Sequence, residues 1–392
     1  MRMDKERLSR IKQAMERQGI DLIVCKNPEN VLYLSGYWPV MGLSLAIFPL
    51  DGEPILIVPE AELEFAREGW IKDIRAYKGE TLDEIWDPHK HILSILKDIE
   101  VPEGARVGCE LYWETMATNS VVGELNYASN ATFDLLRRAW NAELLDITNM
   151  ILNLRMIKTE LELEKITLAN ELAYIGLKAV VEKLGEGVKE SELAAEAERA
   201  VYAEGVGYRK LVRRARAFAF VMSGENSSRA WYPFNISSER RVRKGDVVLI
   251  EFNVCADGYW ADVTRTWILG KPSKEQEDMF STLIEAQEEA FSAIKDGLPA
   301  NEADLIARQV IAKKGYSKLF PHRLGHGIGL RIHEPPALHP KSIDKLCLNM
   351  VITIEPGLYT KDFGIRIEDD VVVMRKGIRN LSPYLKDISP WS

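Results

Sequence analysis

The amino-acid sequence predicts an α/β protein of two domains, the second of which is internally duplicated. Three observations support this fold class. The chain has 392 residues, more than one domain usually contains. Near residue 145 the pattern changes from short alternating apolar runs to long helical repeats. Within the second part, two stretches match each other at a constant offset of 110 residues.

Composition and charge narrow the kind of protein. Hydrophobic residues make up 46% and charged residues 28% of the chain, which is ordinary for a soluble globular protein. A net charge of -8 disfavours nucleic acid or an anionic membrane as the main partner. The start, MRMDKERLSR, is too polar for a signal peptide, and no apolar run approaches the roughly twenty residues that span a bilayer. Because Cys25, Cys109, Cys255 and Cys347 form no CxxC pair, we expect buried, reduced thiols and a cytoplasmic protein.

The first domain is expected to cover residues 1–145 as a compact α/β domain without catalytic residues. Helical patterns cover 4–17 and 60–69, and strand-like runs lie within 21–37 and 45–59. His89 and His91 lie in DPHKHIL, which is more typical of a solvated helix start than of a pair of metal ligands.

The second domain is expected to cover residues 146–392 and to contain a pseudo-twofold repeat. Long helical patterns cover 158–185 and 273–297, and Ser273 with Gln276 forms a capping box at the start of the second. A further helical stretch follows each of them. Four identities relate these stretches: Gly187 and Gly297, Glu192 and Glu302, Ala197 and Ala307, Gly205 and Gly315. A repeated helix-turn-helix unit indicates internal duplication.

A β-hairpin carrying two acidic residues is predicted after each helical pair. The hairpins lie within 245–269 and 350–374. Glu251 and Asp262 are equidistant from the 256/257 junction, and Glu355 and Glu368 from the 361/362 junction. A symmetric hairpin would make each pair a direct cross-strand pair, with Cβ atoms about 4.5–5.5 Å apart.

Four of the six histidines, His322, His326, His333 and His339, fall within eighteen residues around GHGIGLRIHEPP. The alternating glycines argue against a zinc motif on a helix, and Leu330 breaks the Gly-x-Gly-x-x-Gly pattern of a dinucleotide loop. Taken alone, the cluster is equally compatible with a structural role and with a site. Next to the acidic hairpins, His326 offers a nitrogen ligand.

Buried carboxylates this close together require positive charge, because like charges repel and an unpaired buried carboxylate is costly. Arg265, Arg366 or a buried proton could neutralise one pair, but two pairs are explained better by metal cations. Four carboxylates and an imidazole are more than one tetrahedral zinc would take. They favour a centre of two divalent metal ions (Mn, Co, Fe or Zn) that activates water.

Five motifs occur in the order and spacing of a known family. They are LRMIKTELELEKI (154–166), DGYWADVTRT (257–266), GHGIGLRIHE (325–334), ITIEPGLY (352–359) and IRIEDDV (365–371). Together they resemble the pita-bread metallopeptidases, which include methionine aminopeptidase, aminopeptidase P, prolidase (Xaa-Pro dipeptidase) and the metal-free creatinase. The resemblance covers nearly the whole chain and implies a creatinase-like N-terminal domain before a pita-bread domain. That N-terminal domain points to the prolidase or aminopeptidase P branch.

The resemblance implies a role for each matching position. It implies five metal ligands: Glu251, Asp262, His326, Glu355 and Glu368. Asp262 and Glu368 would bridge the two ions, and Glu355 would also shuttle protons. His333 would hydrogen-bond the substrate carbonyl and the developing oxyanion, and Arg366 would orient the acidic network. The glycines around His326 would let the backbone pass close to the ions.

The chain departs from the family pattern at two positions. The family has Asp where this chain has Glu251, and a substrate-contacting histidine where this chain has Trp231. No histidine lies between His91 and His322, so a shifted alignment cannot restore it. Trp231 either packs a pocket wall or changes substrate preference and weakens peptidase activity.

The expected function is that of a dinuclear metal-dependent exopeptidase that hydrolyses Xaa-Pro bonds, as a dipeptidase or as an N-terminal aminopeptidase. Its substrate would be a small peptide, and a homodimer is expected from the resemblance. One alternative is a hydrolase of another small amide or C–N bond. A non-catalytic binding protein is the other, although such a protein should have lost several ligands.

Overall fold

The computed structural model describes residues 3–40, 43–78, 82, 88–111, 130–231 and 236–387. The chain forms two compact units, and the first gives way to the second between Leu154 and Arg155. The domain limits expected from the sequence lie slightly before this point. Among the helices described, none is both long and apolar enough to cross a membrane.

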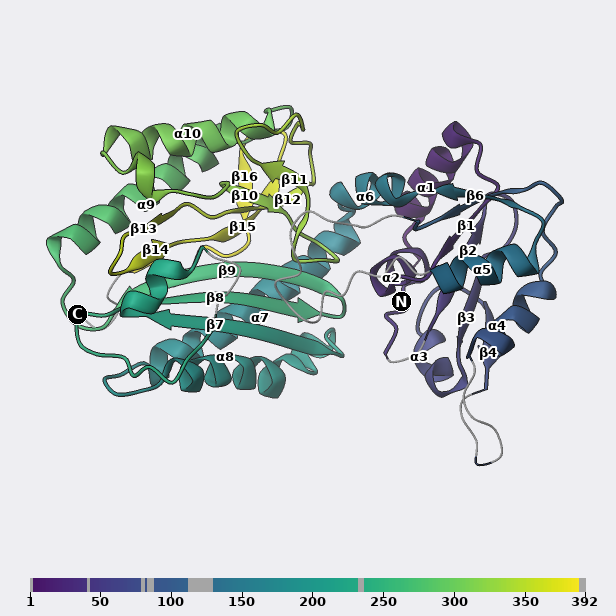
Figure 1. Ribbon diagram of the computed structural model, residues 1–392, viewed down its shortest axis with the longest axis horizontal. Coiled ribbons are helices and arrows are strands. Elements are labelled where there is room, and N and C mark those ends of the chain that lie inside the picture. Colours follow the sequence, from purple (N-terminus) through teal and green to yellow (C-terminus); the bar gives the residue numbers. More distant parts are fainter. Residues whose placement is uncertain are drawn as a thin grey trace. The chain divides into compact units, whose positions relative to one another are not determined.

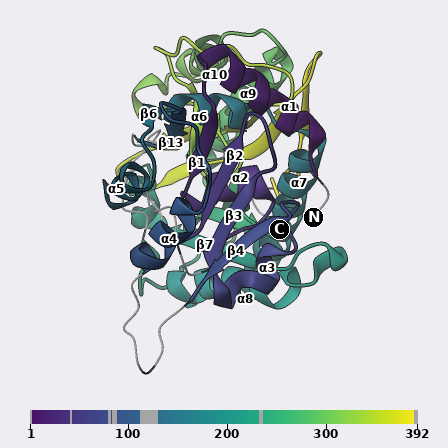
Figure 2. The same cartoon turned by 90° about the vertical axis from the view of Figure 1, so that its right-hand side faces the viewer.

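The N-terminal unit is built on one six-stranded mixed sheet with the strand order β4-β3-β2-β1-β5-β6. The strands are β1 (Leu22–Cys25), β2 (Leu45–Pro49), β3 (Ile55–Pro59), β4 (Asp73–Tyr77), β5 (Arg106–Cys109) and β6 (Glu143–Asp146). The helices are α1 (Lys5–Gln18), α2 (Pro28–Ser35), α3 (Leu63–Ala66), α4 (Pro88–Lys97), α5 (Asn130–Ala139) and α6 (Thr148–Met156). Figure 2 shows β1 to β4 running side by side.

Several local predictions for this unit are confirmed. The helix expected over 4–17 is α1, which begins after Asp4 and buries Ile11 and Met15. The run at 45–59 forms the antiparallel pair β2–β3. His89 is exposed and His91 is half-buried at the start of α4, as expected of a solvated helix start. Of the cysteines, Cys347 is half-buried and the other three are buried.

The C-terminal unit contains two similar halves (Figure 1). The first half comprises α7 (Glu160–Lys183), α8 (Glu190–Gly205), β7 (Ala215–Ser223), β8 (Val247–Ala256) and β9 (Tyr259–Ile268). The second comprises α9 (Lys274–Ala293), α10 (Ala300–Lys313), β10 (Gly325–Gly327), β11 (Glu334–Leu338), β12 (Val351–Ile354), β13 (Gly357–Tyr359), β14 (Gly364–Arg366), β15 (Asp369–Val373) and β16 (Ile378–Asn380). Their sheets run β7-β8-β9 and β11-β10-β12-β15-β16, and β13 pairs with β14.

The predicted duplication is visible in matching backbone hydrogen bonds. Gly187 and Gly297, at the offset of 110 residues, precede α8 and α10 with φ of 85° and 90°. The Gly187 N–H donates to Val242 O at 2.8 Å, and the Gly297 N–H donates to Leu346 O at 2.7 Å. A positive φ favours glycine at both positions. The two halves therefore begin their second helix in the same way.

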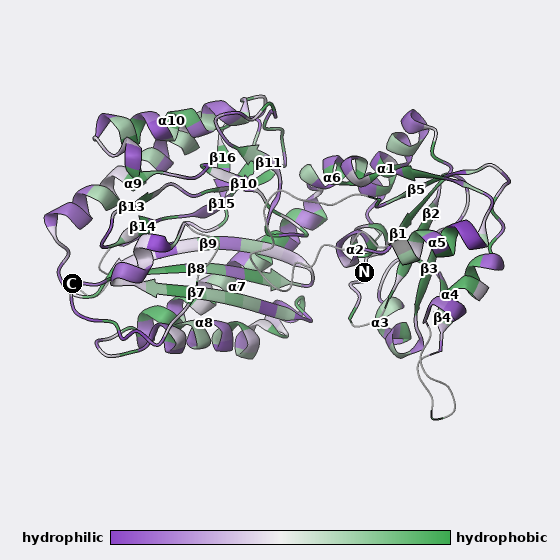
Figure 3. Cartoon of the chain, in the orientation of Figure 1, coloured by the Kyte–Doolittle hydropathy of each residue, from purple (hydrophilic) through white to green (hydrophobic). Residues whose placement is uncertain are grey.

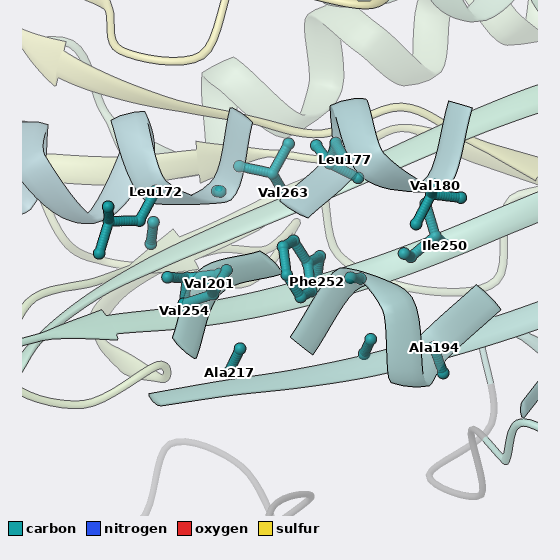
Figure 4. Packing of buried hydrophobic residues seen from close by; sticks show 14 of the residues in the cluster. Leu172, Leu177, Val180, Ala194, Val201, Ala217, Ile250, Phe252, Val254 and Val263 are labelled. Atoms are coloured by element: carbon teal, nitrogen blue, oxygen red, sulfur yellow. The ribbon is translucent and has the colours of Figure 1, made fainter. Parts of the chain in front are cut away.

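The core of the first half determines which side of β8 faces the site. Figure 4 shows Ile250, Phe252 and Val254 of β8 among apolar side chains of α7 and α8. At Gly176 of α7 a Cβ would lie 2.4 Å from Phe252, so the helix and the strand approach closely there. Figure 3 shows β8 as largely hydrophobic. Because side chains alternate along a strand, Glu251 and Asn253 point to the opposite face, away from the helices.

Candidate metal centre

The first hairpin carries Glu251 and Asp262 on one face, although not in the expected register. Its turn is formed by Asp257 and Gly258, with φ of 49° and 91°, the positive values for which Asp-Gly turns are favoured. Asp262 therefore pairs with Asn253. The predicted direct pair of Glu251 and Asp262 is wrong, because the hairpin is centred one residue later than the 256/257 junction. The two acids remain diagonal neighbours, since side chains two positions apart share a face.

The second hairpin has the register expected for Glu355 and Glu368. The flanking pairs are Ile354 with Asp369 and Gly357 with Arg366. Both ladders are centred on the 361/362 junction, and Glu355 and Glu368 stand between them. Their own backbone N–H groups donate to neighbouring segments instead, to Leu324 O and Thr264 O. The chain opens locally at the two acidic residues.

His326 in β10 presents one nitrogen to the carboxylates. Its Nδ1 lies 3.0 Å from Gly327 O. Because a carbonyl oxygen only accepts, Nδ1 carries the proton and Nε2 keeps its lone pair. Nε2 lies 3.7 Å from Asp262 Oδ2 and 3.6 Å from Glu355 Oε1. These separations exceed those of hydrogen bonds and suit ligand atoms placed around a common cation.

Two groups of side chains offer ligand atoms that all lie within 4.8 Å of one another. One group is Asp262, His326 and His333, and the other is His326, Glu355 and Glu368. Imidazole nitrogen and carboxylate oxygen suit Mn, Fe, Co and Zn, so this donor set fits a divalent metal ion. Within the described part of the chain, Glu251 belongs to neither group.

The electrostatics of the centre also favour a cation. Burial raises the pKa of Asp262 and of Glu355 well above the ordinary values, and the charge of Glu368 adds to both shifts. Burial raises the pKa of Glu368 to about 7. Burial also lowers the pKa of His326 well below its usual value, so its imidazole is neutral and available as a ligand. A cation bound here would stabilise the ionised acids that burial disfavours.

Arg366 compensates the charge of Glu251. Its Nη2 donates to Glu251 Oε2 at 2.6 Å, and its Nε donates to Thr264 Oγ1 at 3.0 Å. The Thr264 hydroxyl in turn donates to Glu368 Oε2 at 2.7 Å. These contacts are those of a residue that orients acidic side chains. Arg265 does not share this role, because its guanidinium binds Asp369 and backbone carbonyls.

The glycines around His326 are required by neighbouring backbone. A Cβ on Gly325 would lie 1.9 Å from Thr353 O, and a Cβ on Gly327 would lie 2.1 Å from Pro335 O. The glycines therefore allow the strand of His326 to approach its neighbouring strands closely.

Only two of the four clustered histidines come together. The ring of His333, which is half-buried, has its centroid 4.5 Å from that of His326. The Nε2 of His322 lies 3.0 Å from the Tyr359 hydroxyl, and burial lowers the pKa of His322 to about 3. His339 is exposed. His322 and His339 are thus absent from the two ligand groups.

Two residues of the centre were missed from the sequence. Asn253 Nδ2 donates to Asp262 Oδ1 at 2.6 Å, and Thr264 links Arg366 to Glu368. A signal was available in the sequence. Asn253 is two positions from Glu251 on β8, and Thr264 is two positions from Asp262 on β9, so each shares a face of the sheet with its acidic neighbour.

Trp231 lines a cavity of about 760 Å³. Among the described residues, the cavity is also lined by Met222, Asn226, Ser228, Arg229, Ile236 and Ser238. Trp231 is 42% exposed, so its indole forms part of the cavity wall while remaining open to solvent. The Ala230 carbonyl next to it accepts a hydrogen bond from Arg366 Nη1 at 3.0 Å. The cavity therefore adjoins the network around Glu251.

A buried carboxylate fixes the turn before His333. Glu334, 1% exposed, accepts hydrogen bonds from Arg155 Nε at 3.1 Å and from Lys158 Nζ at 3.3 Å. Two backbone N–H groups of the preceding turn also donate to it, each at 3.1 Å. Burial lowers the pKa of Lys158, and the charge of Glu334 opposes that shift. Arg155 and Lys158, both within the motif at 154–166, thus hold Glu334 and, through it, the turn that precedes His333.

Another buried carboxylate fixes the segment that contains Trp231. Glu190 Oε1 accepts from the Ser223 N–H at 2.6 Å, and its Oε2 accepts from the Ser238 N–H at 2.9 Å. Both serine hydroxyls and the Asn226 amide donate to the same carboxylate. In contrast to those of Glu334, these side-chain donors are neutral.

Comparison with known proteins identifies the family. The metallopeptidase family M24 matches residues 164–375, and the creatinase/prolidase N-terminal domain matches residues 7–157. The Xaa-Pro dipeptidase of Pyrococcus furiosus is 33% identical over 386 residues, which cover 98% of this chain and 99% of that protein.

Solved structures agree with this assignment. The prolidase from Pyrococcus horikoshii OT3 superposes with a TM-score of 0.78 at 29% identity, covering 98% of this chain and 100% of that one. The X-Pro aminopeptidase from Thermotoga maritima MSB8 gives a TM-score of 0.79 at 28% identity, covering 96% and 99%. The expected creatinase-like N-terminal domain and pita-bread domain are confirmed. The chain belongs to metallopeptidase family M24.

Proposed function

We propose that this protein is a metal-dependent exopeptidase that hydrolyses Xaa-Pro bonds, as a dipeptidase or as an N-terminal aminopeptidase. One observation carries the proposal: Asp262, His326, Glu355 and Glu368 converge in a buried centre with His333 beside it. The full-length similarity to Xaa-Pro dipeptidases supports the substrate class. A small peptide substrate, a cytoplasmic location and a homodimer complete the proposal.

The centre would hold divalent ions, chosen among Mn, Co, Fe and Zn, and its carboxylates have the capacity for two. His326 Nε2 and the oxygens of Asp262, Glu355 and Glu368 are the proposed ligands. Such ions activate water as a nucleophile near neutral pH. Arg366 holds Glu251 and, through Thr264, Glu368 in place.

Two residues handle the proton and the substrate in this proposal. Glu355 accepts a proton from water and passes it to the leaving amine, which suits the raised pKa of its carboxyl. His333, half-buried beside the ligands, donates a hydrogen bond to the substrate carbonyl, where negative charge develops in the transition state.

Trp231 favours a second candidate, a hydrolase of another small amide or C–N bond. An indole in the cavity wall offers an apolar surface where the family pattern has an imidazole donor. Substrates with a bulky apolar group would fit this wall, and ordinary Xaa-Pro peptides would be cleaved slowly.

The test is hydrolysis by the purified, metal-loaded protein. Xaa-Pro dipeptides and Xaa-Pro-Yaa tripeptides are compared with matched peptides that carry Ala in place of Pro. The proposal expects cleavage before proline only, and a fall of about a hundredfold or more in kcat for His333→Ala with the metal content unchanged. A metal-loaded protein that cleaves no Xaa-Pro peptide would contradict it.

A further inference from the structure

The cavity of about 760 Å³ lies on the same face of the first sheet as the acidic residues. Met222 of β7, which lines the cavity, pairs with Leu249 of β8. Glu251 is two positions further along β8, so its side chain and that of Leu249 share a face. Met222 and Leu249 also pack with Tyr359 in one buried cluster. A peptide held at the metal centre can therefore extend into the cavity.

Buried hydrogen bonds fix the walls of this cavity. Glu190, which is fully buried, accepts from the Asn226 amide at 3.0 Å and from the Ser238 hydroxyl at 2.6 Å. Asn226 and Ser238 both line the cavity. The hydroxyl of Ser227, next to Asn226, accepts from the Gly364 N–H at 2.9 Å. A wall held in this way loses little further freedom when a ligand binds, which favours affinity.

The cavity is larger than a dipeptide substrate requires. Its volume of about 760 Å³ falls within the range of roughly 300–1,000 Å³ that is typical of pockets for drug-sized ligands. The proline of an Xaa-Pro dipeptide adds only three methylene groups to the backbone and would fill a small part of it. Room therefore remains for a further residue.

Three apolar side chains contribute to the cavity wall. Met222 is buried, whereas Trp231 is 42% and Ile236 is 64% exposed. Large apolar side chains that remain open to solvent in a concave site are typical of a ligand-binding surface. The further residue is therefore expected to have a large apolar side chain.

Arg229 is the single charged side chain among the described residues that line the cavity. It is exposed, and no ion pair or hydrogen bond of its side chain is found within the described part of the chain. A guanidinium binds a carboxylate through two parallel hydrogen bonds and repels an ammonium group. Because a peptide is negative at its carboxyl end and positive at its amino end, the cavity suits the carboxyl end.

We infer that this cavity binds the carboxyl-terminal residue of a tripeptide Xaa-Pro-Yaa, in which Yaa is a large apolar residue. The Yaa side chain packs against Trp231 and Ile236, and its terminal carboxylate binds Arg229. Hydrolysis adds water across the Xaa–Pro bond and releases Xaa and the dipeptide Pro-Yaa. This inference rests on the proposed function and favours its aminopeptidase form over its dipeptidase form.

The first test compares kcat/KM of the metal-loaded, full-length protein for Ala-Pro-Phe, Ala-Pro-Gly, Ala-Pro and the amide Ala-Pro-Phe-NH2. Ala-Pro-Phe should exceed each of the others by about tenfold or more, because burial of an aromatic side chain and a charge-assisted hydrogen bond each contribute that much. Trp231→Ala should reduce the preference for Phe over Gly. Arg229→Gln should bring the ratio of acid to amide to about one. The matched control is Arg375→Gln, an exposed arginine between β15 and β16, which should keep the wild-type ratios.

The second test does not depend on catalysis. Calorimetry measures the binding of Pro-Phe, the product expected from Ala-Pro-Phe, to the chelator-treated full-length protein. Pro-Phe should bind at least about tenfold more tightly than Pro-Gly and than Pro-Phe-NH2. Arg229→Gln should remove the difference between Pro-Phe and its amide.

Equal binding of Pro-Phe and Pro-Phe-NH2 to the wild type would overturn the inference, and so would equal rates for Ala-Pro-Phe and Ala-Pro. Both results leave the proposed hydrolysis of Xaa-Pro bonds intact. A folded Arg229→Gln protein that keeps the preference for the free acid would also overturn the inference. A protein that binds Pro-Phe with the expected preferences but cleaves no Xaa-Pro peptide contradicts the proposed function alone.

Discussion

The two halves of the duplicated domain share a scaffold but differ in how their acidic residues are compensated. In the first half, Glu251 is paired with Arg366, and one carboxylate oxygen of Asp262 accepts a hydrogen bond from the Asn253 amide. In the second half, Glu355 and Glu368 stand between the two ladders of the hairpin, and burial raises their pKa as it raises that of Asp262 in the first half. His326 also belongs to the second half.

This difference shows that duplication of a fold does not duplicate its chemistry. The matching hydrogen bonds of Gly187 and Gly297 keep the backbones alike, whereas the side chains on the equivalent hairpins have separate tasks. Hydrogen bonds from Arg366 and Asn253 already stabilise the carboxylates of the first half. The second half depends more on a metal ion, so changes there should have the larger effects.

The largest expected effect is a difference in metal binding between a variant of the second half and a variant of the first. His326→Ala should abolish metal binding and activity, because it removes the nitrogen common to both ligand groups. Glu251→Gln should keep bound metal and measurable activity, because Glu251 belongs to neither ligand group among the described residues. Metal analysis and proline release check both variants, with the exposed His339→Ala as the control. Equal loss of metal in the Glu251 and His326 variants would remove the contrast between the halves.

The buried carboxylates of Glu190 in the first half and Glu334 in the second extend the comparison of the two halves to stability. Glu334→Gln removes the negative charge that Arg155 and Lys158 contact and should lower the free energy of unfolding by about 3–5 kcal/mol. Glu190→Gln meets only neutral side-chain donors and should cost about 1–3 kcal/mol. Denaturant unfolding measures both. A larger loss for Glu190→Gln would show that the charge of the donors is not decisive.

The metal-free protein should become less stable as pH rises through neutrality. The pKa of Glu368 in the folded protein is raised to about 7. Stability is therefore greatest below the ordinary Glu pKa and is lost as pH rises through about 7, by about 3 kcal/mol for this group alone. Unfolding of chelator-treated protein between pH 5 and 8 checks this, and Glu368→Gln should flatten the dependence. The metal-loaded protein should lose less, because metal binding favours ionised ligands. A metal-free protein that gains stability over this range would contradict the pKa assignment.

The smallest expected effect comes from restoring the family pattern in the first half. Trp231→His adds a donor to the cavity wall, and Glu251→Asp shortens the acid that pairs with Arg366. Together they should raise kcat/KM for Xaa-Pro dipeptides by about tenfold, part of the hundredfold that one transition-state donor can contribute. The single variants serve as controls for each other. If the double variant cleaves these peptides no faster than the wild type, the two departures do not limit activity.

The elements and the candidate ligands could be predicted because their signals are local. Helical periodicity located the repeat, apolar runs on either side of a turn located both hairpins, and acidic residues within apolar strands indicated the centre. The register of the first hairpin could not be settled in this way. A shift of one residue in the turn changes the partner of Asp262 from Glu251 to Asn253.

The sequence by itself determined the two-domain α/β organisation, the duplication and the residue types needed for a metal centre, because these follow from local patterns. Only the tertiary structure decided the partner of each polar side chain. Arg366 and Glu251 are 115 residues apart in the chain, and Arg155 and Glu334 are 179 apart. Such pairs depend on how strands and helices pack in three dimensions, and no periodic pattern along the chain encodes that packing.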